Sequence, residues 1–451
     1  MDDLISSEDL ETCLRVLRRA VDLDPTDSKV RAIEQAAAGL RKRAKKARRA
    51  ERAKARQAHD AAMLAQTTLH QSQKTPDVDA PLLGGALHAP RRCYACKQGY
   101  VQVHARYHAM CPTCGACNEA RRAQRADLTR RVALVTGGRI KIGFATALKL
   151  LRDGATVHVS TRFPEDARAR YAALPDVEQW KTRLHIHGVD FRDIRGVQAF
   201  AAQLAARGPL DILVHNAAQT VRRPDAFYRT LARAELAGHT PSSNITALEY
   251  APERAAAYQA WLRQCVQQTD DEGWFPEGAL SINGEPLDLR EETSWRMTLE
   301  EVPAGELMEV WVINAFVPYV LNATLKPALL ASPFSDRYVV HVTATEGQFS
   351  WAHKSEHHPH LNMGKAALNM LTRTSAQAWA KQGIYMTAVD TGWVSDGGTE
   401  ASRRAHHARG WKPPLDAIDA AARIYDPIVQ GVTQARYLHG VLLKDYREVP
   451  W

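Results

Sequence analysis

Residues 131–162 constrain the fold of this chain more than any other stretch. An apolar run at 132–135 is typical of a buried parallel strand, and Gly137 and Gly138 directly after it indicate a tight turn. A second apolar run, at 155–159, comes one helix length later. The apolar residues between the two runs recur at helical spacing: Phe144, Leu148 and Leu151. The order of strand, glycine turn, helix and strand predicts a βαβ unit.

A glycine turn between a strand and a helix has a known chemistry. Glycines let backbone amides approach a pyrophosphate, and the positive end of the following helix stabilises its negative charge. We therefore expect a dinucleotide-binding site in an α/β protein with a Rossmann-type, doubly wound parallel sheet.

Length and composition set the class of protein. With 451 residues, the chain is long enough for two or three domains, and 45% apolar with 24% charged residues is ordinary for a soluble protein. No apolar run reaches membrane-spanning length, and the first ten residues carry acids where a signal peptide carries bases. These features predict a cytoplasmic location.

The net charge of +9 has a local source. Residues 41–56 contain ten bases and one acid, a balance of 10 − 1 = +9. Periodicity predicts two helices in the basic region 1–70, the second continuing through the run, and a linker follows at 71–90. The run is either a solvated or self-associating helix, or a surface that attracts nucleic acid, acidic lipid or an acidic protein. No aromatic residue lies among the bases, which disfavours stacking on single strands.

Five of the seven cysteines lie within 93–117, a density that indicates metal binding in a reducing compartment. Two Cys-x2-Cys pairs, each a source of two thiolates, are separated by fourteen residues: Cys93, Cys96, Cys111 and Cys114. They predict a closed structural zinc site in a zinc-ribbon or treble-clef module at 91–126, the alternative being chance spacing. His104, His108 and Cys117 leave a RING-like second site open.

From residue 131 to about 389, the chain resembles the short-chain dehydrogenase/reductase family. TGGRIKIG at 136–143 stands where the family has Thr-Gly-x3-Gly-x-Gly, and LVHNAA at 213–218 replaces the Asn-Asn-Ala-Gly strand end. Asp190 follows the third strand, Asn314 lies in a helix like that of the family's active-site Asn, and Lys365 begins a helix like that of its catalytic Lys. The resemblance implies one Rossmann domain over 127–451.

The resemblance also implies the residues that hold the cofactor: Gly137, Gly138, Arg139, Ile142, Gly143, Arg162, Asp190, Asn216 and Lys365. NAD-preferring members end the second strand with an acid, whereas this chain has Thr161 and Arg162 there, with Arg139 and Lys141 in the glycine loop. Positive charge suits the 2′-phosphate of NADP(H). The alternative is that these bases are merely solvated.

Two departures concern catalysis. The family's Tyr-x3-Lys motif places Leu361 at the position of the catalytic Tyr, and the best overlay places Ala344 at that of the catalytic Ser, with Thr343 and Thr345 beside it. In the implied mechanism, the Tyr transfers a proton and the Ser orients the substrate oxygen. Only Lys365 and Asn314 remain, together with a threonine that could orient the substrate.

A histidine could replace the missing Tyr. His358 precedes the helix that Pro359 begins, seven residues before Lys365, so its imidazole could face the same side. Alternatively, the histidines at 353, 357, 358 and 360 bind a metal, or they are surface residues, and water supplies the proton.

The third departure is an insertion. Asn216 and Asn314 lie 98 positions apart, more than is usual for the family, and the added segment spans about 222–299. It contains a helix-like run at 252–268 and a turn signal at Asn283-Gly284. Because it leaves the carboxyl end of a parallel strand, we expect it to cover the ligand crevice as a lid or docking surface, unless it is merely a tolerated insertion.

Two hypotheses follow. The first is an NADP(H)-dependent oxidoreductase with altered catalytic residues, which acts on an unknown carbonyl or alcohol substrate. The second is a non-catalytic NADP(H)-binding scaffold or sensor, whose zinc module and basic helix recruit a partner. The resemblance also implies a helix-mediated homo-oligomer.

Overall fold

The computed structural model describes residues 5–71, 82–238, 246–248, 252–269, 273–281, 284–395 and 397–451. Within them, the central sheet has nine strands in the order β11-β10-β9-β8-β6-β3-β4-β5-β7. All neighbouring pairs are parallel except β10 and β11. The strands are β3 (Val132–Thr136), β4 (Thr156–Thr161), β5 (Leu184–Gly188), β6 (Ile212–His215), β7 (Thr246–Leu248), β8 (Arg337–Thr343), β9 (Ile384–Asp390), β10 (Leu442–Lys444) and β11 (Arg447–Val449).

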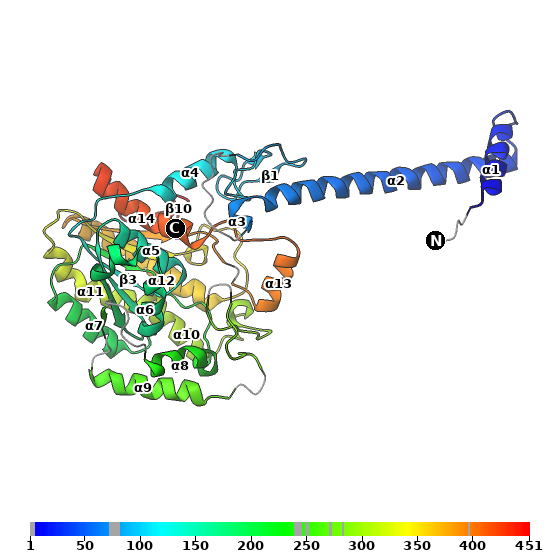
Figure 1. Ribbon diagram of the computed structural model, residues 1–451. Helices are drawn as coiled ribbons and strands as arrows, with labels where there is room; N and C mark the ends of the chain where they lie inside the picture. Colours follow the sequence, from blue (N-terminus) through cyan, green and yellow to red (C-terminus); the bar gives the residue numbers. More distant parts are fainter. Residues whose placement is uncertain are drawn as a thin grey trace.

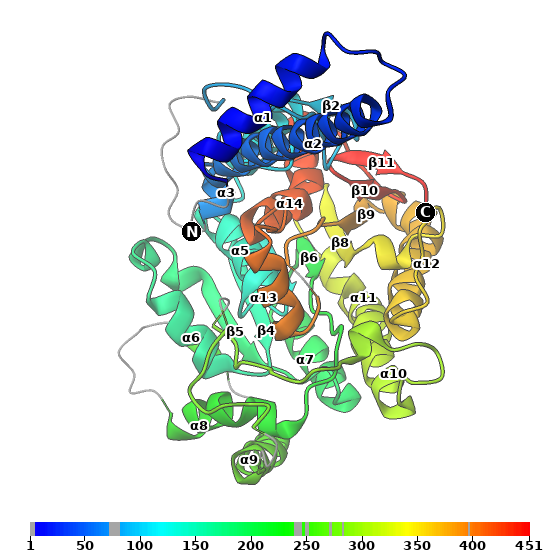
Figure 2. The ribbon, with the colours of Figure 1, turned by 90° about the vertical axis from the view of Figure 1, so that its right-hand side faces the viewer.

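Helices cover both faces of this sheet, which confirms the predicted Rossmann-type architecture (Figure 2). One core lies under α5 (Lys141–Arg152), α6 (Pro164–Ala172) and α14 (Ala417–Gln434). The other lies under α7 (Ile194–Ala206), α11 (Val317–Leu330) and α12 (Pro359–Ala380). The strand order reverses between β3 and β6, which places the ligand crevice at the carboxyl ends of these two strands.

The N-terminal region forms an arm of two helices, α1 (Ser7–Ala20) and α2 (Ser28–Ala65), followed by the short α3 (Thr68–Gln71). A capping box between Ser6 and Asp9 begins α1, and the Asp27 side chain caps α2. Figure 1 shows α2 projecting from the body with α1 at its far end. The predicted continuation of the second helix through the basic run is confirmed.

The cysteine-rich segment forms a small hairpin, β1 (Arg91–Arg92) with β2 (Gly99–Tyr100), followed by α4 (Pro112–Ala123). It docks onto the C-terminal part of the chain through buried contacts. The Tyr107 hydroxyl donates to Asp419 at 2.7 Å, and Arg122 pairs with Asp419 at 3.0 Å. The Tyr94 hydroxyl accepts from the backbone of Trp393 at 2.9 Å. The predicted docking of this module on the main domain is thus observed.

The insertion contributes η3 (Asp225–Tyr228), α8 (Arg229–Ala237), β7, α9 (Pro252–Gln267) and η4 (Ser294–Arg296). Its helices enclose a separate apolar cluster that includes Phe163, Phe227, Leu231 and Leu262. The predicted helix at 252–268 is therefore observed. Asn283, the first residue of the predicted turn, lies outside the described residues.

After the insertion, α10 (Ala304–Trp311), the π-helical turn η5 (Val312–Phe316) and α11 run on continuously. This segment, Ala304–Leu330, has 27 residues and is long and apolar enough to cross a membrane by length and composition alone. The sequence analysis had found no apolar run of membrane-spanning length. Half of its most apolar window is buried, and α11 packs against α7 as a core helix.

The remaining elements complete the sheet and its edges. The short η1 (Val177–Gln179) and η2 (Lys181–Arg183) precede β5, and η6 (Thr345–Gly347) follows β8. After β9, the chain forms α13 (Glu400–Ala408), α14, and the edge strands β10 and β11. The expectation that the C-terminal tail packs on the main domain is confirmed, because β10 pairs with β9.

Candidate active site and cysteine cluster

The glycine loop between β3 and α5 has the conformation that close backbone approach requires. Gly137 has a φ of +66°, and a Cβ there would lie 2.9 Å from the Cα of Ala217. A Cβ on Gly143 would lie 2.3 Å from the Gly137 carbonyl oxygen. Asn216, at the end of β6, donates to the carbonyls of Thr136 and Gly137 at 3.0 and 3.1 Å. These contacts join the loop to the strand across the switch point.

Lys141 occupies the loop position where the family has a glycine. Its φ is +52°, a left-handed conformation that is uncommon for a residue with a Cβ. The residue is exposed to solvent. Partial desolvation lowers its pKa, and the positive charges of Arg223 and Arg403 add to this effect while Glu285 opposes it.

The two arginines expected at the 2′-phosphate already have partners. Arg139 pairs with Asp166 at 2.6 Å and with Glu285 of the insertion. Arg162, at the end of β4, donates to the Tyr228 hydroxyl at 3.0 Å, and its guanidinium lies 4.8 Å from that ring's centroid. The insertion thus covers the crevice on its β4 side, as a lid would.

Asp190, expected at the adenine, forms a two-pronged pair with Arg192, with the shortest contact at 2.6 Å. These hydrogen bonds, together with the charges of Arg162 and Arg192, lower the Asp190 pKa against the effect of burial, which raises it. The Arg192 guanidinium lies 4.9 Å from the Trp261 ring centroid of α9. This end of the crevice is therefore also lined by the insertion.

Lys365 and Asn314 lie beside the crevice on α12 and η5. The Lys365 ammonium donates to the Val342 carbonyl at 2.9 Å, and burial lowers the Lys365 pKa to about 8. Asn314 accepts from the backbone N–H of Gln219 at 2.8 Å and donates to its carbonyl at 2.9 Å. Gly364 packs against Asn314, since a Cβ on it would lie 3.4 Å from the Asn314 Cβ.

Comparisons with known proteins agree with this architecture. The family described as "short chain dehydrogenase" matches residues 131–237. The chain is 30% identical over 357 residues to "Uncharacterized protein R665" of Acanthamoeba polyphaga mimivirus, covering 75% of this chain and 71% of that protein. It is 42% identical over 93 residues to a "Probable oxidoreductase" of Streptomyces lividans, covering 20% and 29%.

The chain belongs to the short-chain dehydrogenase/reductase family. Among solved structures, it is similar to the Pseudomonas aeruginosa RhlG/NADP active-site complex, with 19% identity, a TM-score of 0.45, and coverage of 70% of this chain and 95% of that one.

Within this short-chain dehydrogenase/reductase fold, the position of the family Tyr holds the buried Leu361, which has no proton to transfer. Thr343 is 2% exposed, and its hydroxyl has no hydrogen-bond partner among the described residues. Thr345 instead donates to Glu346 at 3.3 Å. Of the two threonines, Thr343 therefore keeps a hydroxyl free, although it is deeply buried.

His358 packs against the insertion. It has a φ of +45° directly before α12, its ring stacks on Trp295 with centroids 4.4 Å apart, and its Nδ1 contacts the Trp295 carbonyl at 2.8 Å. The left-handed backbone turns the side chain toward η4. His353 and His357 are exposed and half-buried respectively, and no metal-ligand group forms among these histidines in the described chain.

The sequence interpretation missed His360 as a single candidate. It is 1% exposed, and the Thr220 backbone is the one group whose hydrogen bonding acts on its ring, through a contact too long or too bent for a regular hydrogen bond. It precedes Gly364 by one helical turn, so it shares the face of α12 that packs on Asn314. Burial lowers its pKa, and the Glu306 carboxylate and the Thr220 backbone oppose that effect. In the sequence, the one indication of this role is the spacing of four residues between His360 and Gly364, which places both on one face of the predicted helix.

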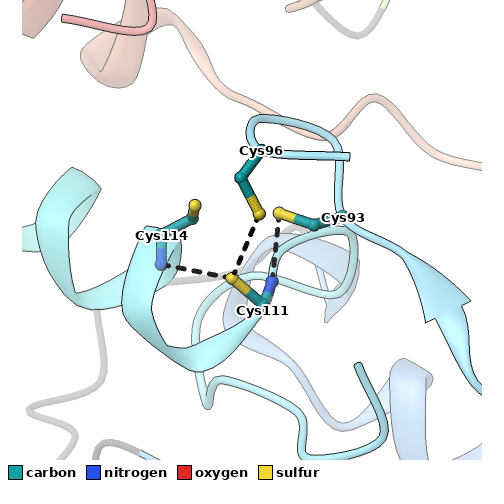
Figure 3. A group of neighbouring side chains, drawn as sticks. All are labelled: Cys93, Cys96, Cys111 and Cys114. Carbon is teal, nitrogen blue, oxygen red and sulfur yellow. Dashed lines mark hydrogen bonds between the residues drawn. The ribbon is translucent and has the colours of Figure 1, made fainter. Parts of the chain in front are cut away.

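Outside the crevice, four cysteines converge in the N-terminal module (Figure 3). Cys93 and Cys96 come from the hairpin, and Cys111 and Cys114 from the start of α4. Their sulfurs all lie within 4.8 Å of one another, with Cys96 and Cys111 3.8 Å apart. The edge of a zinc tetrathiolate is also about 3.8 Å, given Zn–S bonds of about 2.3 Å. The donor set and its spacing therefore fit zinc.

The three spare candidates for a second site do not converge. His104 packs against Gly115 and lies 3.5 Å from Glu119, whereas His108 contacts the Lys412 carbonyl at 3.2 Å. Cys117 is exposed. Among the described residues, they form no shared group of ligands.

Proposed function

We propose that this protein is an NADP(H)-dependent oxidoreductase that acts on a carbonyl or alcohol substrate, with a proton-transfer residue different from the family's Tyr. The observation that carries the proposal is the glycine loop at the switch point, in which Gly137 and Gly143 keep their close backbone contacts and Asn216 donates to the loop carbonyls.

Charge supports a phosphorylated cofactor. Lys141, Arg139, Arg223 and Arg403 lie close enough around the loop for their charges to act on one another. Lys141 has no ion pair among the described residues, so we assign it to the cofactor phosphates. Arg139 and Arg162 would hold the 2′-phosphate, the first by exchanging Glu285 for it. NADPH, when bound, supplies the hydride.

His360 is the residue that we assign to proton transfer. It is protonatable and buried, it makes no regular hydrogen bond, and it lies on the α12 face beside Asn314. Since burial lowers its pKa below 6.5, the imidazole is mainly neutral at pH 7. Reduction, which consumes a proton, should therefore accelerate as the pH falls below 6.5. Thr343 is the candidate for orienting the substrate oxygen, and Lys365 for holding the ribose.

The test is a screen for carbonyl-dependent NADPH oxidation, followed by pH–rate profiles of three proteins. We expect the wild type and His353→Ala, a change in an exposed loop histidine, to show the same rise in turnover at low pH. His360→Ala should lose ~10²-fold or more and give a flat profile. An unchanged pH–rate profile in His360→Ala would show that His360 does not transfer the proton. Tight NADPH binding without turnover on any carbonyl would rule out the oxidoreductase function.

The scaffold hypothesis keeps one supporting observation. The aliphatic Leu361 fills the position where the family has its proton donor, and it is 2% exposed. A non-catalytic NADP(H) sensor would retain the loop and Lys365 while losing chemistry. The same screen separates the two functions.

We also propose that the four cysteines bind one structural zinc ion. Four thiolates leave no open position for substrate, so the metal would fold the module rather than catalyse. Metal analysis of freshly purified protein should return one zinc per chain. A four-cysteine cluster without zinc at neutral pH would contradict the assignment.

A further inference from the structure

The arm formed by α2 carries a charge that the rest of the molecule does not neutralise. The helix has 38 residues, about 57 Å at 1.5 Å per residue. The ten bases at 41–56 have no ion pair or hydrogen bond from their side chains to any described residue, and nearly all of the run is exposed. Figures 1 and 2 show that the body does not cover this part of the helix.

The bases are arranged on one side. At about 100° per residue, eight of the ten fall within roughly 160° of the helix circumference. They are Arg41, Lys42, Lys45, Lys46, Arg48, Arg49, Arg52 and Arg56. The single acid, Glu51, falls on the opposite side. An ordinary solvated helix alternates charges of both signs, which stabilise it in pairs four residues apart. This run instead repeats like charges, which repel one another until a polyanion binds.

The composition of the run distinguishes between polyanions. Its only uncharged residue type is alanine, so it lacks the large apolar face with which a helix inserts into a lipid surface. It lacks aromatic residues, on which single-stranded bases would stack. A regular row of bases about 24 Å long matches the regular phosphate spacing of a duplex, and a helix of ordinary diameter fits its major groove.

We propose that the α2 arm binds double-stranded nucleic acid through the phosphate backbone, without reading its sequence. The bound duplex lies along residues 41–56, away from the Rossmann body. The proposal is independent of the oxidoreductase function, because none of these residues contacts the crevice.

The experiment measures fluorescence anisotropy of the full-length protein with a labelled 20-base-pair duplex of scrambled sequence. The test variant changes Arg41, Lys45, Arg48, Arg49 and Arg52 to Gln, a residue that preserves helix propensity. The matched control changes Ala47, Ala50 and Ala53 to Gln, which leaves the charge intact. Circular dichroism checks helix content in all three proteins.

With eight phosphate contacts, the slope of log K against log salt should be about −7, and about −3 in the test variant. The control should match the wild type. Equal binding of the test variant and the wild type would overturn the proposal. Tighter binding to dT20, to vesicles of phosphatidylserine and phosphatidylcholine, or to poly-glutamate than to the duplex would also overturn it, in favour of the polyanion that binds more tightly.

Discussion

At the scale of single residues, Glu285 has an unexpected place. It comes from the insertion, yet it neutralises Arg139 in the glycine loop, and it opposes the fall in the Lys141 pKa. If Arg139 holds the 2′-phosphate as we propose, a carboxylate in this position competes with that phosphate for the arginine. No local sequence pattern could have shown this pair, because its members are 146 positions apart.

Glu285→Gln should therefore bind NADPH more tightly than the wild type, by about 3- to 10-fold, while NADH affinity changes less. The measurement is a titration of nucleotide binding by protein fluorescence. Glu277→Gln, a change in an exposed insertion residue that pairs with Arg233, is the matched control and should have no effect. Weaker NADPH binding in Glu285→Gln would show that the carboxylate organises the loop rather than competing for it.

Burial of Lys365 makes the free energy of unfolding depend on pH. Its pKa is about 8 in the folded chain and ~10.4 when unfolded, so between these values the unfolded chain binds more protons. The free energy of unfolding should therefore rise with pH across this window, by up to about 3 kcal/mol. Lys365→Met should remove this contribution. Urea unfolding at pH 7 and pH 10 measures it, and an equal pH response in both proteins would contradict the burial argument.

At the scale of elements, much of the fold followed from the sequence. The apolar runs at 132–135 and 155–159 predicted β3 and β4. Periodicity predicted that α2 continues through the bases at 41–56. These predictions succeeded because their signals are local. The stacking of His358 on Trp295 could not be predicted, because its left-handed backbone is not encoded in helix periodicity. The hairpin of β10 and β11 was missed because its two-residue turn, Asp445-Tyr446, has positive φ at both residues without a glycine. The ion pairs of the insertion were missed because they depend on long-range contacts.

Disruption of the cysteine module should destabilise other parts of the chain, because the module packs on the C-terminal region. Its core includes Leu415, and Tyr107 hydrogen-bonds to Asp419 at the start of α14. Cys96→Ser should abolish zinc retention and lower the melting temperature by several degrees, because structural zinc contributes directly to folding. Cys13→Ser, in the exposed α1, is the control. Full zinc occupancy in Cys96→Ser would disprove a four-thiolate site.

At the scale of the whole molecule, several large apolar side chains on three helices of the body are exposed. They lie on α10, α11 and α12: Met308, Trp311, Tyr319, Met363 and Met370. Exposed apolar residues that gather on one side of a protein are typical of an interface. We propose that two copies pair through these helices, as the family resemblance implied.

Replacing both Tyr319 and Met370 with Glu should convert this dimer to a monomer, because like charges would face each other across a symmetric interface. Light scattering after size exclusion measures the mass. Phe349→Glu, on an exposed loop residue, should leave the dimer intact. A wild type that is already monomeric at micromolar concentration would contradict the interface.

The proposed function requires a phosphorylated nucleotide in the glycine loop, with Lys141 as one of its ligands. Calorimetric titration of NADPH and NADH into the wild type and Lys141→Gln tests this most directly. We predict one site per chain, at least 10-fold tighter for NADPH than for NADH, and a loss of NADPH affinity of about 10-fold in Lys141→Gln. No binding of either nucleotide, or equal affinity for both that the substitution leaves unchanged, would contradict the account.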